Sequence, residues 1–276
     1  MRFVAPSRAA LDPAVLSRPP LAAWSDAADW IAAAEFPSVA ELNRGWEQSW
    51  RFVEQTPQLL ADGLHYETRI HARAEIATRA DNWHDFFNAL IWRRHAAVKA
   101  ALNRRQVAEI ARMGDKQRSR AQCALTHFDE GGVVVVLRDP ALLACWDAHD
   151  WRGLFWDARQ AWHDGRIRAE VFGHALLEMA LVPGKLITGK AVAVLDDDGV
   201  TMPQALNALA AAIAAGRLLN DPQELRALPI SGIPGWHPAN DDAAFYAEAE
   251  CFRPLRAGRR YPPPLRMAYA CPYSSP

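Results

Sequence analysis

A helix start is predicted at the stretch Asn82-Trp83-His84-Asp85-Phe86-Phe87-Asn88. Asp81 or Asn82 can cap this helix, because a short polar side chain before the first turn accepts hydrogen bonds from its free amide groups. On the helix, His84 and Asn88 are four residues apart and Asp85 and Asn88 are three apart, so the three side chains share one surface. Two interpretations stay open for these polar groups: a cap with a polar stripe, or donors to a ligand or a divalent metal ion.

A second polar pair lies in the stretch Phe172-Gly173-His174-Ala175-Leu176-Leu177-Glu178. His174 and Glu178 are one helical turn apart, and the other residues of this helix are apolar. In the simpler interpretation, a core histidine is hydrogen-bonded to a glutamate of its own helix. In the alternative, the pair meets His84 and Asp85, and two imidazoles with two carboxylates are enough to bind a metal ion or to transfer protons.

Helical patterns predominate in the rest of the chain. Capping boxes at Ser38-Val39-Ala40-Glu41 and Thr201-Met202-Pro203-Gln204 predict helices that reach about Trp50 and Leu219. Further helices are predicted over residues 104–113, 141–163 and 171–181.

Strands are fewer. Residues 65–70 alternate like a half-buried strand. Residues 125–128 and 133–137 flank Asp129-Glu130-Gly131-Gly132, which predicts a β-hairpin because paired glycines suit a tight turn. The apolar run 133–136 indicates that its second strand is buried. Residues 190–195 predict another strand, which closes on the turn Asp196-Asp197-Asp198-Gly199.

The C-terminal segment, residues 222–276, differs in kind because it holds ten of the 19 prolines. Proline removes amide donors, so this segment is expected to wrap irregularly around the body. Together the patterns predict an α+β fold that is predominantly helical, with a few short strands, a β-hairpin near residues 125–137 and an irregular proline-rich C-terminal wrap. Without a repeat or a flexible Gly/Ser linker, residues 1–276 are predicted to form a single globular domain.

Composition and simple motifs exclude several classes of protein. A formal net charge of −1 argues against coating nucleic acid or membrane by net charge alone. The N-terminus lacks a signal-peptide pattern, and no run approaches the roughly 18–20 apolar residues that span a bilayer. The four widely spaced cysteines form no Cys-x-x-Cys pair, so a cytoplasmic protein with reduced thiols is expected. Gly184-Lys185-Leu186-Ile187-Thr188-Gly189-Lys190-Ala191 has the spacing of a phosphate loop but lacks its final Ser/Thr and follows a predicted helix.

The stretch 93–120 is basic, with nine Lys/Arg residues against Glu109 and Asp115. It suits either a solvated helix face or a patch that binds nucleic acid. Since the rest of the chain balances the charge, we expect the solvated face and no nucleic-acid partner.

Several long motifs, taken in order, resemble a bacterial domain-of-unknown-function family, number 3025. The resemblance covers residues 67–253 and implies that His84, Asp85, Asn88, Asp129, Glu130, His174 and Glu178 belong to the family's pattern. It also implies a bacterial cytoplasmic protein. The chain departs from the family pattern at His95-Ala96, where the pattern has an aromatic residue followed by proline, so the sequence does not support the helix break that the pattern implies there. The motifs are Glu67-Thr68-Arg69-Ile70, the run from Thr78 to Leu90, Lys99 with Leu102-Asn103, Leu125-Thr126 with Phe128-Asp129-Glu130 and Gly132, Phe172 to Glu178, Gly232-Ile233-Pro234-Gly235-Trp236, Asn240, Phe245-Tyr246 and Phe252-Arg253.

Three functions are compatible with these residues. The first is a metal-dependent hydrolase, with phosphoesters as one candidate substrate class and with His84, Asp85, His174 and Glu178 as catalytic and metal-binding residues. Arg69, Arg79 and Lys99 would then hold an anionic, phosphate-bearing ligand, with Asn88, Asp129 and Glu130 as further ligand-binding residues. The second is a non-enzymatic binding or scaffold protein in which the same residues form buried networks. The third is a nucleic-acid binder that uses residues 93–120.

Overall fold

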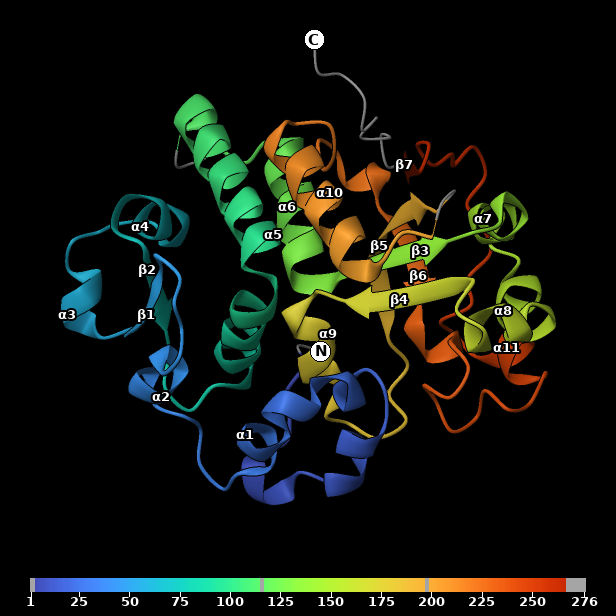
Figure 1. The fold of residues 1–276 in the computed structure, drawn as a ribbon, viewed down its shortest axis with the longest axis horizontal. Coiled ribbons are helices and arrows are strands. Elements are labelled where there is room, and N and C mark those ends of the chain that lie inside the picture. Colours follow the sequence, from blue (N-terminus) through green and yellow to red (C-terminus); the bar gives the residue numbers. More distant parts are fainter. Residues whose placement is uncertain (1–2, 115–116, 197–198, 267–276) are drawn as a thin grey trace, which may run out of the picture.

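The helix predicted from Asn82 is α5, Trp83–Met113, which crosses the middle of the computed structural model (Figure 1). The Asn82 side chain caps it, because its oxygen accepts a hydrogen bond from the Asp85 amide at 3.0 Å. The helix is kinked at His95, whose φ of −127° and ψ of 40° are not helical. The absence of a proline at His95-Ala96 put a helix break here in doubt, but the break is present. The structure describes residues 3–114, 117–196 and 199–266.

A five-stranded mixed sheet forms the second part of the core. The central strand β3, Gly132–Leu137, is buried along its whole length, which confirms the predicted buried strand. Around it the strand order is β4-β3-β5-β6, and β7 also pairs with β5. β3 is parallel to β5 and antiparallel to β4. The other bounds are β4 Ile167–Val171, β5 Thr188–Leu195, β6 Arg226–Pro229 and β7 Leu265–Arg266, and a separate parallel pair is formed by β1 Arg51–Glu54 and β2 Glu75–Thr78.

Helices cover this sheet, so the fold is α+β and predominantly helical, as predicted. α5 packs against α4, α6, α9 and α10, and α6 and α9 also contact the sheet. Figure 1 shows α7, α8 and α11 at the far side of the sheet from α5. The remaining helices are α1 Ala28–Ala32, α2 Val39–Asn43, α3 Pro57–Leu60, α4 Tyr66–Arg73, α6 Arg120–Gly131, α7 Pro140–Asp147, α8 Arg159–His163, α9 His174–Ala180, α10 Met202–Ala214 and α11 Phe245–Glu248.

The predicted hairpin near residues 125–137 is wrong. Its first strand is the second half of α6, which begins with a capping box between Ser119 and Gln122. The run 125–128 is short enough to fit either period, and as a helix it buries Leu125 and Phe128 on one face. The chain then enters β3 directly at Gly132. A Cβ there would lie 2.3 Å from the Phe128 carbonyl oxygen, so this glycine permits the close approach rather than a turn.

The strand predicted over residues 65–70 is also wrong, because these residues begin α4. His65 caps α4, since its Nδ1 accepts a hydrogen bond from the Glu67 amide at 3.3 Å. Its buried residues are the adjacent Arg69 and Ile70. The strand pattern treated Arg69 as exposed because it is charged, whereas its side chain is buried.

The other predicted helices and strands are present, but several begin or end at different residues. Both capping boxes are present, but α2 ends at Asn43 and α10 at Ala214, short of the predicted Trp50 and Leu219. Residues 104–113 form the last part of α5. The helix predicted over 141–163 is divided into α7, a π-helical turn Gly153–Asp157 and α8, and residue 171 closes β4 before α9 begins. The strand over 190–195 is confirmed within β5. Of the turn expected at 196–199, residues 197–198 lie outside the described residues.

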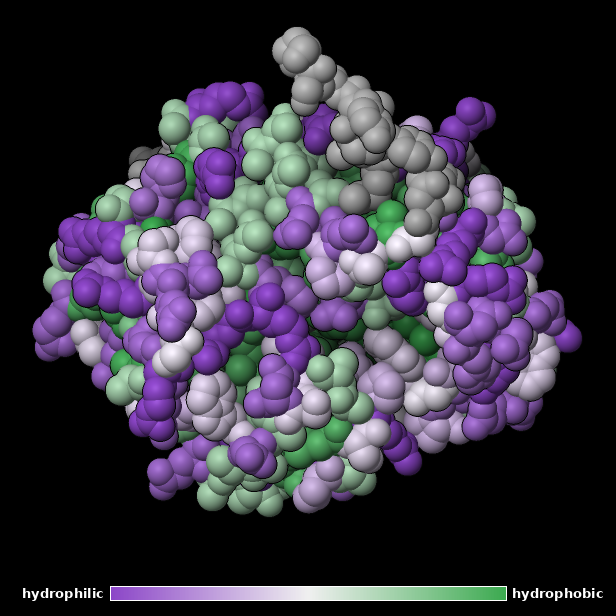
Figure 2. Space-filling model, in the orientation of Figure 1, coloured by the Kyte–Doolittle hydropathy of each residue, from purple (hydrophilic) through white to green (hydrophobic). Residues whose placement is uncertain are grey.

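The described part of the proline-rich segment, residues 222–266, wraps the body and forms only short elements, as predicted. Asn240 is fully buried and donates to the carbonyl oxygens of Ser231 and Ile233 at 3.0 and 2.6 Å. Further on, Arg226 of β6 donates to the Pro262 carbonyl oxygen at 2.6 Å. Figure 2 shows hydrophilic residues spread over much of this face, with a weakly hydrophobic area over α10. Within the described ranges, no helix is both long enough and apolar enough to cross a membrane.

Candidate functional site

A polar pocket of about 250 Å³ lies between α4, α5, α6 and α9. The kink of α5 lets both of its segments reach it: His84 and Asn88 come from before His95, and Lys99 and Asn103 from after it. The pocket is lined by Gln55, Tyr66, Glu67, Ile70, Ala77, Arg79, His84, Asp85, Asn88, Trp92, Lys99, Leu102, Asn103, Gln106, Leu125, Thr126, Asp129, Glu130 and His174.

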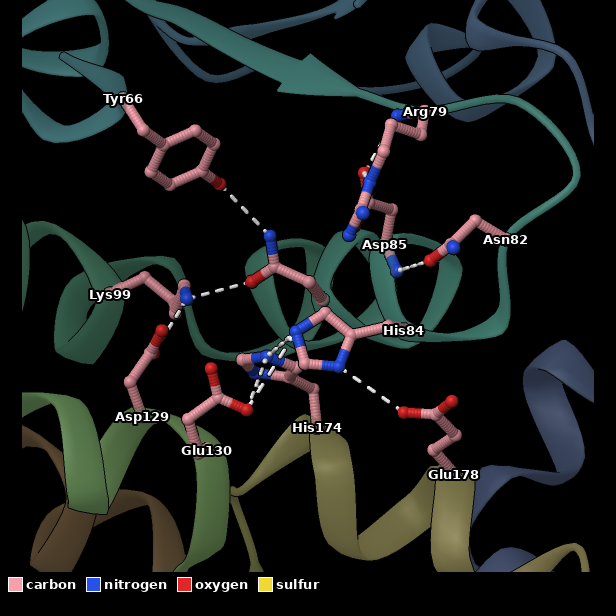
Figure 3. A network of polar contacts seen from close by, with 11 residues as sticks. Tyr66, Arg79, Asn82, His84, Asp85, Lys99, Asp129, Glu130, His174 and Glu178 are labelled. Atoms are coloured by element: carbon pink, nitrogen blue, oxygen red, sulfur yellow. Dashed lines mark hydrogen bonds and ion pairs between the residues drawn. The ribbon is translucent and has the colours of Figure 1, made fainter. Parts of the chain in front are cut away.

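Two histidines and a glutamate meet at one edge of this pocket. The Nε2 atoms of His84 and His174 are 3.0 Å apart, and the two rings stand edge to face. Glu130 Oε2 lies 3.7 Å from His84 Nε2 and 3.5 Å from His174 Nε2. Figure 3 shows Glu130 beside both rings, and the three side chains come from α5, α6 and α9. Among the described residues, these three groups are placed to hold a metal ion.

The dimensions of this triad suit a transition-metal ion such as zinc. With bonds of about 2.0–2.1 Å, a tetrahedral ion holds its ligand atoms about 3.3 Å apart. The three separations of 3.0, 3.5 and 3.7 Å are close to that value. Three protein ligands also leave a fourth position for water or substrate, as catalytic zinc sites do.

Glu178 contacts His84 from the other side. Its Oε2 lies 3.2 Å from His84 Nδ1, so a proton on Nδ1 leaves the Nε2 lone pair of His84 free for a metal ion. The hydrogen bond with Glu178 raises the pKa of His84 against the opposing effect of burial. Glu178 was predicted as a metal ligand, but the structure places its carboxylate behind the ligand, where it orients the ring.

His174 is buried, and burial lowers its pKa to about 3. Its ring is therefore neutral at physiological pH, which is the form that binds metal ions. No described residue makes a hydrogen bond to its Nδ1. Metal binding through Nε2 places the proton of His174 on Nδ1, where no described residue accepts it.

The pocket lining holds more acidic than basic groups, which favours the binding of a cation. Its described lining holds four carboxyl groups (Glu67, Asp85, Asp129 and Glu130) but only two groups with a fixed positive charge, Arg79 and Lys99. Burial raises the pKa of Glu130, and Asp129 adds to that effect while His84 opposes it. A divalent cation would offset this concentration of negative charge.

A chain of hydrogen bonds continues from the triad along the pocket wall. Lys99 Nζ donates to Asp129 Oδ1 at 2.6 Å and to Asn88 Oδ1 at 2.8 Å. Asn88 Nδ2 in turn donates to the Tyr66 hydroxyl oxygen at 3.0 Å (Figure 3). Burial raises the pKa of Asp129, but the charge and hydrogen bond of Lys99 together with the nearby His174 and His84 outweigh it, so the pKa lies below its usual range.

Asp85 does not join the two histidines, contrary to the predicted metal set. Its carboxylate accepts from Arg79 Nε and Nη2 at 3.0 and 2.7 Å and from the Arg79 backbone amide at 2.7 Å. This two-point pair holds the segment before α5 against the first turn of the helix. Glu130 supplies the carboxylate that was expected from Asp85. It reaches the site because residues 125–131 are helical.

Arg69 is not a ligand-binding residue of this pocket, which corrects the prediction. It is 1% exposed and does not line the pocket. Its guanidinium donates to Glu75 Oε2 at 3.1 Å, to the Leu59 carbonyl oxygen at 2.8 Å and to Asp62. Arg69 therefore links α4 to β2, to α3 and to the loop between α3 and α4.

Sequence reasoning missed Tyr66 and Glu67 as pocket residues because it placed them in a strand. Asn103 Nδ2 donates to the Glu67 carbonyl oxygen at 2.9 Å and to its Oε2 at 2.6 Å. Tyr66, Glu67 and Ile70 have helical spacing, and that spacing was the available signal.

Replacing Glu67 by glutamine is expected to raise the melting temperature by a few degrees at pH 7.5. Burial raises the pKa of the Glu67 carboxyl, and the hydrogen bond from Asn103 only partly opposes this. The folded protein therefore binds this proton more tightly than the unfolded chain does. As a result, the free energy of unfolding falls as the pH rises from the ordinary pKa of a glutamate through the raised pKa of Glu67 in the folded protein.

Thermal melts between pH 4 and pH 8 measure the effect. The gap between Glu67→Gln and the wild type should shrink as the pH falls toward 4. A Glu248→Gln variant, which changes an exposed glutamate of α11, is the matched control. A gap that does not depend on pH would contradict the assignment.

Comparison with known proteins gives one family match. Neither the curated proteins nor the solved structures contain a match to this chain. One family model, described as "Protein of unknown function (DUF3025)", matches residues 50–256. That range includes α4, α5, α6 and α9, which supply most of the pocket and all three groups of the triad. The chain therefore belongs to the DUF3025 family.

Proposed function

We propose that the protein is a metal-dependent hydrolase in which His84, Glu130 and His174 bind one divalent cation. The observation that carries the proposal is the triangle of two imidazole nitrogens and one carboxylate oxygen, 3.0–3.7 Å apart, at the edge of a polar pocket. Imidazole and carboxylate ligands suit zinc, manganese or iron. When bound, such an ion polarises a substrate oxygen and lowers the pKa of a water molecule toward 7.

The protein's own residues take distinct roles in this proposal. Glu178 keeps the proton of His84 on Nδ1, so that Nε2 faces the ion. Lys99, 4% exposed and lining the pocket, faces the anionic part of the substrate. Arg79 lines the same pocket, though Asp85 takes two of its donor nitrogens. Because both cations suit phosphate oxygens, a small phosphoester is the substrate class we propose.

Metal analysis is the first test. After treatment with a chelator and dialysis, the protein is titrated with Zn²⁺, Mn²⁺, Co²⁺ or Mg²⁺, and bound metal is measured by elemental analysis. We expect about one ion per chain and a rise in melting temperature with at least one of the metals. Absence of both with every ion would contradict the proposal.

Turnover is the second test. The loaded protein is assayed on p-nitrophenyl phosphate, on bis-p-nitrophenyl phosphate and on p-nitrophenyl acetate, which separate monoester, diester and carboxylester hydrolysis. We expect release of nitrophenol from a phosphate ester that the chelator abolishes and the metal restores. Hydrolysis of the acetate alone would overturn the phosphoester class.

The competing function is a scaffold in which the same side chains are structural. The observation that favours it is that most polar groups near the pocket already have protein partners, as Asp85 has in Arg79 and Glu67 in Asn103. A scaffold predicts that removing the triad lowers stability rather than metal affinity.

A nucleic-acid binder gets less support. In the described part of the stretch 93–120, ion pairs with carboxylates engage Arg94, Lys99, Arg112 and Arg120. Charges paired in this way contribute less to phosphate binding, because the carboxylate must first be displaced.

A further inference from the structure

The orientation of the Asn88 amide can be assigned from its neighbours. Oxygen and nitrogen of an amide are hard to distinguish by shape, so the assignment depends on the hydrogen-bond network. Lys99 Nζ is 2.6 Å from Asp129 Oδ1 and 2.8 Å from the Asn88 side chain. An ammonium group only donates, so the Asn88 atom that faces it must be Oδ1. The other atom of the amide, Nδ2, then faces Tyr66.

This orientation fixes the role of the Tyr66 hydroxyl. Asn88 Nδ2 is a donor, so the Tyr66 oxygen, 3.0 Å away, must accept from it. The phenolic proton then has to point away from Asn88. No described residue accepts it, and burial raises the pKa of Tyr66 further above its usual value, so the hydroxyl keeps that proton.

Lys99 has a similar unused donor. Its ammonium carries three protons, and Asp129 and Asn88 take two of them. Among the described residues none accepts the third. The Lys99 side chain is 5% exposed, so this donor lies in an enclosed position where an unpaired N–H is costly. Both Lys99 and Tyr66 line the pocket, and Asn88 is hydrogen-bonded to both.

We propose that the Tyr66 hydroxyl and the Lys99 ammonium form an oxyanion subsite that binds the phosphate or carboxylate group of the substrate. The inference rests on the proposed function for its place in catalysis, and it names the part of the substrate that the pocket recognises. Tyr66 donates a hydrogen bond to one oxygen of the group, and Lys99 donates another and supplies charge. Asn88 positions both donors without touching the ligand.

The subsite makes a prediction that is independent of the metal ion. Chelator-treated protein is titrated calorimetrically with inorganic phosphate and, separately, with acetate. Wild-type protein should bind at least one of them, and Tyr66→Phe should weaken that binding about tenfold. Phosphate binding alone assigns the subsite to phosphoryl groups; acetate binding of equal strength assigns it to any small oxyanion.

Controls separate this role from a structural one. Tyr261→Phe removes a hydroxyl that contacts His149 outside the pocket and should leave anion affinity unchanged. Tyr66→Phe should keep the metal affinity of the wild type, and its melting temperature should fall by only a few degrees, because Asn88 Nδ2 loses one acceptor. If Tyr66→Phe binds the anion as tightly as the wild type, or if the wild type binds neither anion, the subsite is refuted.

The two proposals can fail separately. Anion binding that depends on Tyr66 in a protein that binds no metal would support the subsite and overturn the hydrolase. Metal binding and turnover with no dependence on Tyr66 would support the hydrolase and overturn the subsite. The phosphate titration is repeated with His174→Gln, which lacks one of the proposed metal ligands. Unchanged phosphate affinity in this variant excludes binding through residual metal.

Discussion

Replacing His84 by alanine is expected to lower the affinity for the divalent cation by at least about 100-fold while the melting temperature of the metal-free protein stays within about 2 °C of the wild type. Loss of a residue that only orients a ligand already costs about 10–100-fold, so the loss of a ligand should exceed that. The His84 side chain is 31% exposed, and Glu178 can regain water when the imidazole is removed. Little folding energy therefore depends on this ring.

Two measurements check the result: equilibrium dialysis with elemental analysis for the bound ion, and thermal melts in the presence of a chelator. His174→Gln should show the same loss of affinity while filling most of the volume of this buried side chain. His127→Ala is the matched control, because His127 lies on the exposed side of α6 and does not line the pocket. A fall of many degrees with unchanged metal affinity would identify the triad as a structural network and favour the scaffold.

Replacing Arg69 by methionine is expected to destabilise the protein by about 3 kcal/mol, with a melting temperature lower by about 5 °C. Arg69 is 1% exposed and pairs with Glu75, 12% exposed, and with Asp62, 24% exposed. Removing the guanidinium leaves Glu75 and Asp62 only their exposed partners, Arg51 and Arg73. The Leu59 carbonyl oxygen also loses a buried donor.

Arg73→Met is the control for this prediction. Arg73 lies on the same helix and pairs with the same Asp62, but it is 47% exposed. Exposed ion pairs contribute about 0–1 kcal/mol, so this variant should melt within a few degrees of the wild type. The folded fraction of Arg69→Met should bind metal and phosphate normally. A variant that is stable but has lost anion binding would restore Arg69 as a ligand residue.

The kink in α5 connects the fold to the proposed chemistry. A straight helix of 31 residues would carry His84 and Lys99, fifteen positions apart, far along its axis. The non-helical backbone at His95 turns the second segment so that both residues line one pocket. His95 is buried beside Glu170 of β4, with its Nε2 3.2 Å from the Glu170 carboxylate, so the break lies where α5 contacts β4.

Several features follow from the sequence alone because they depend on neighbouring residues. The cap at Asn82 and the capping boxes at Ser38 and Thr201 each join a side chain to an amide three residues ahead. The run 133–136 is apolar without alternation, so it could only be a buried strand or a buried helix, and the strand is what forms. The helical spacing of His174 and Glu178 is likewise local. These local signals single out His84, His174 and Glu178, which contact one another in the structure.

The partners of those residues were decided only by the tertiary structure. Asp85 and Glu130 are both acidic and near a predicted site, yet Asp85 binds Arg79, six residues away, and Glu130 joins histidines 46 and 44 residues distant. Tyr66 and Lys99 face one pocket because α4 packs on α5 and α5 bends. A hydrogen bond across 90 residues, such as that between His84 and His174, carries no local signal. It forms because burying the apolar faces of α5, α6 and α9 brings their polar ends together.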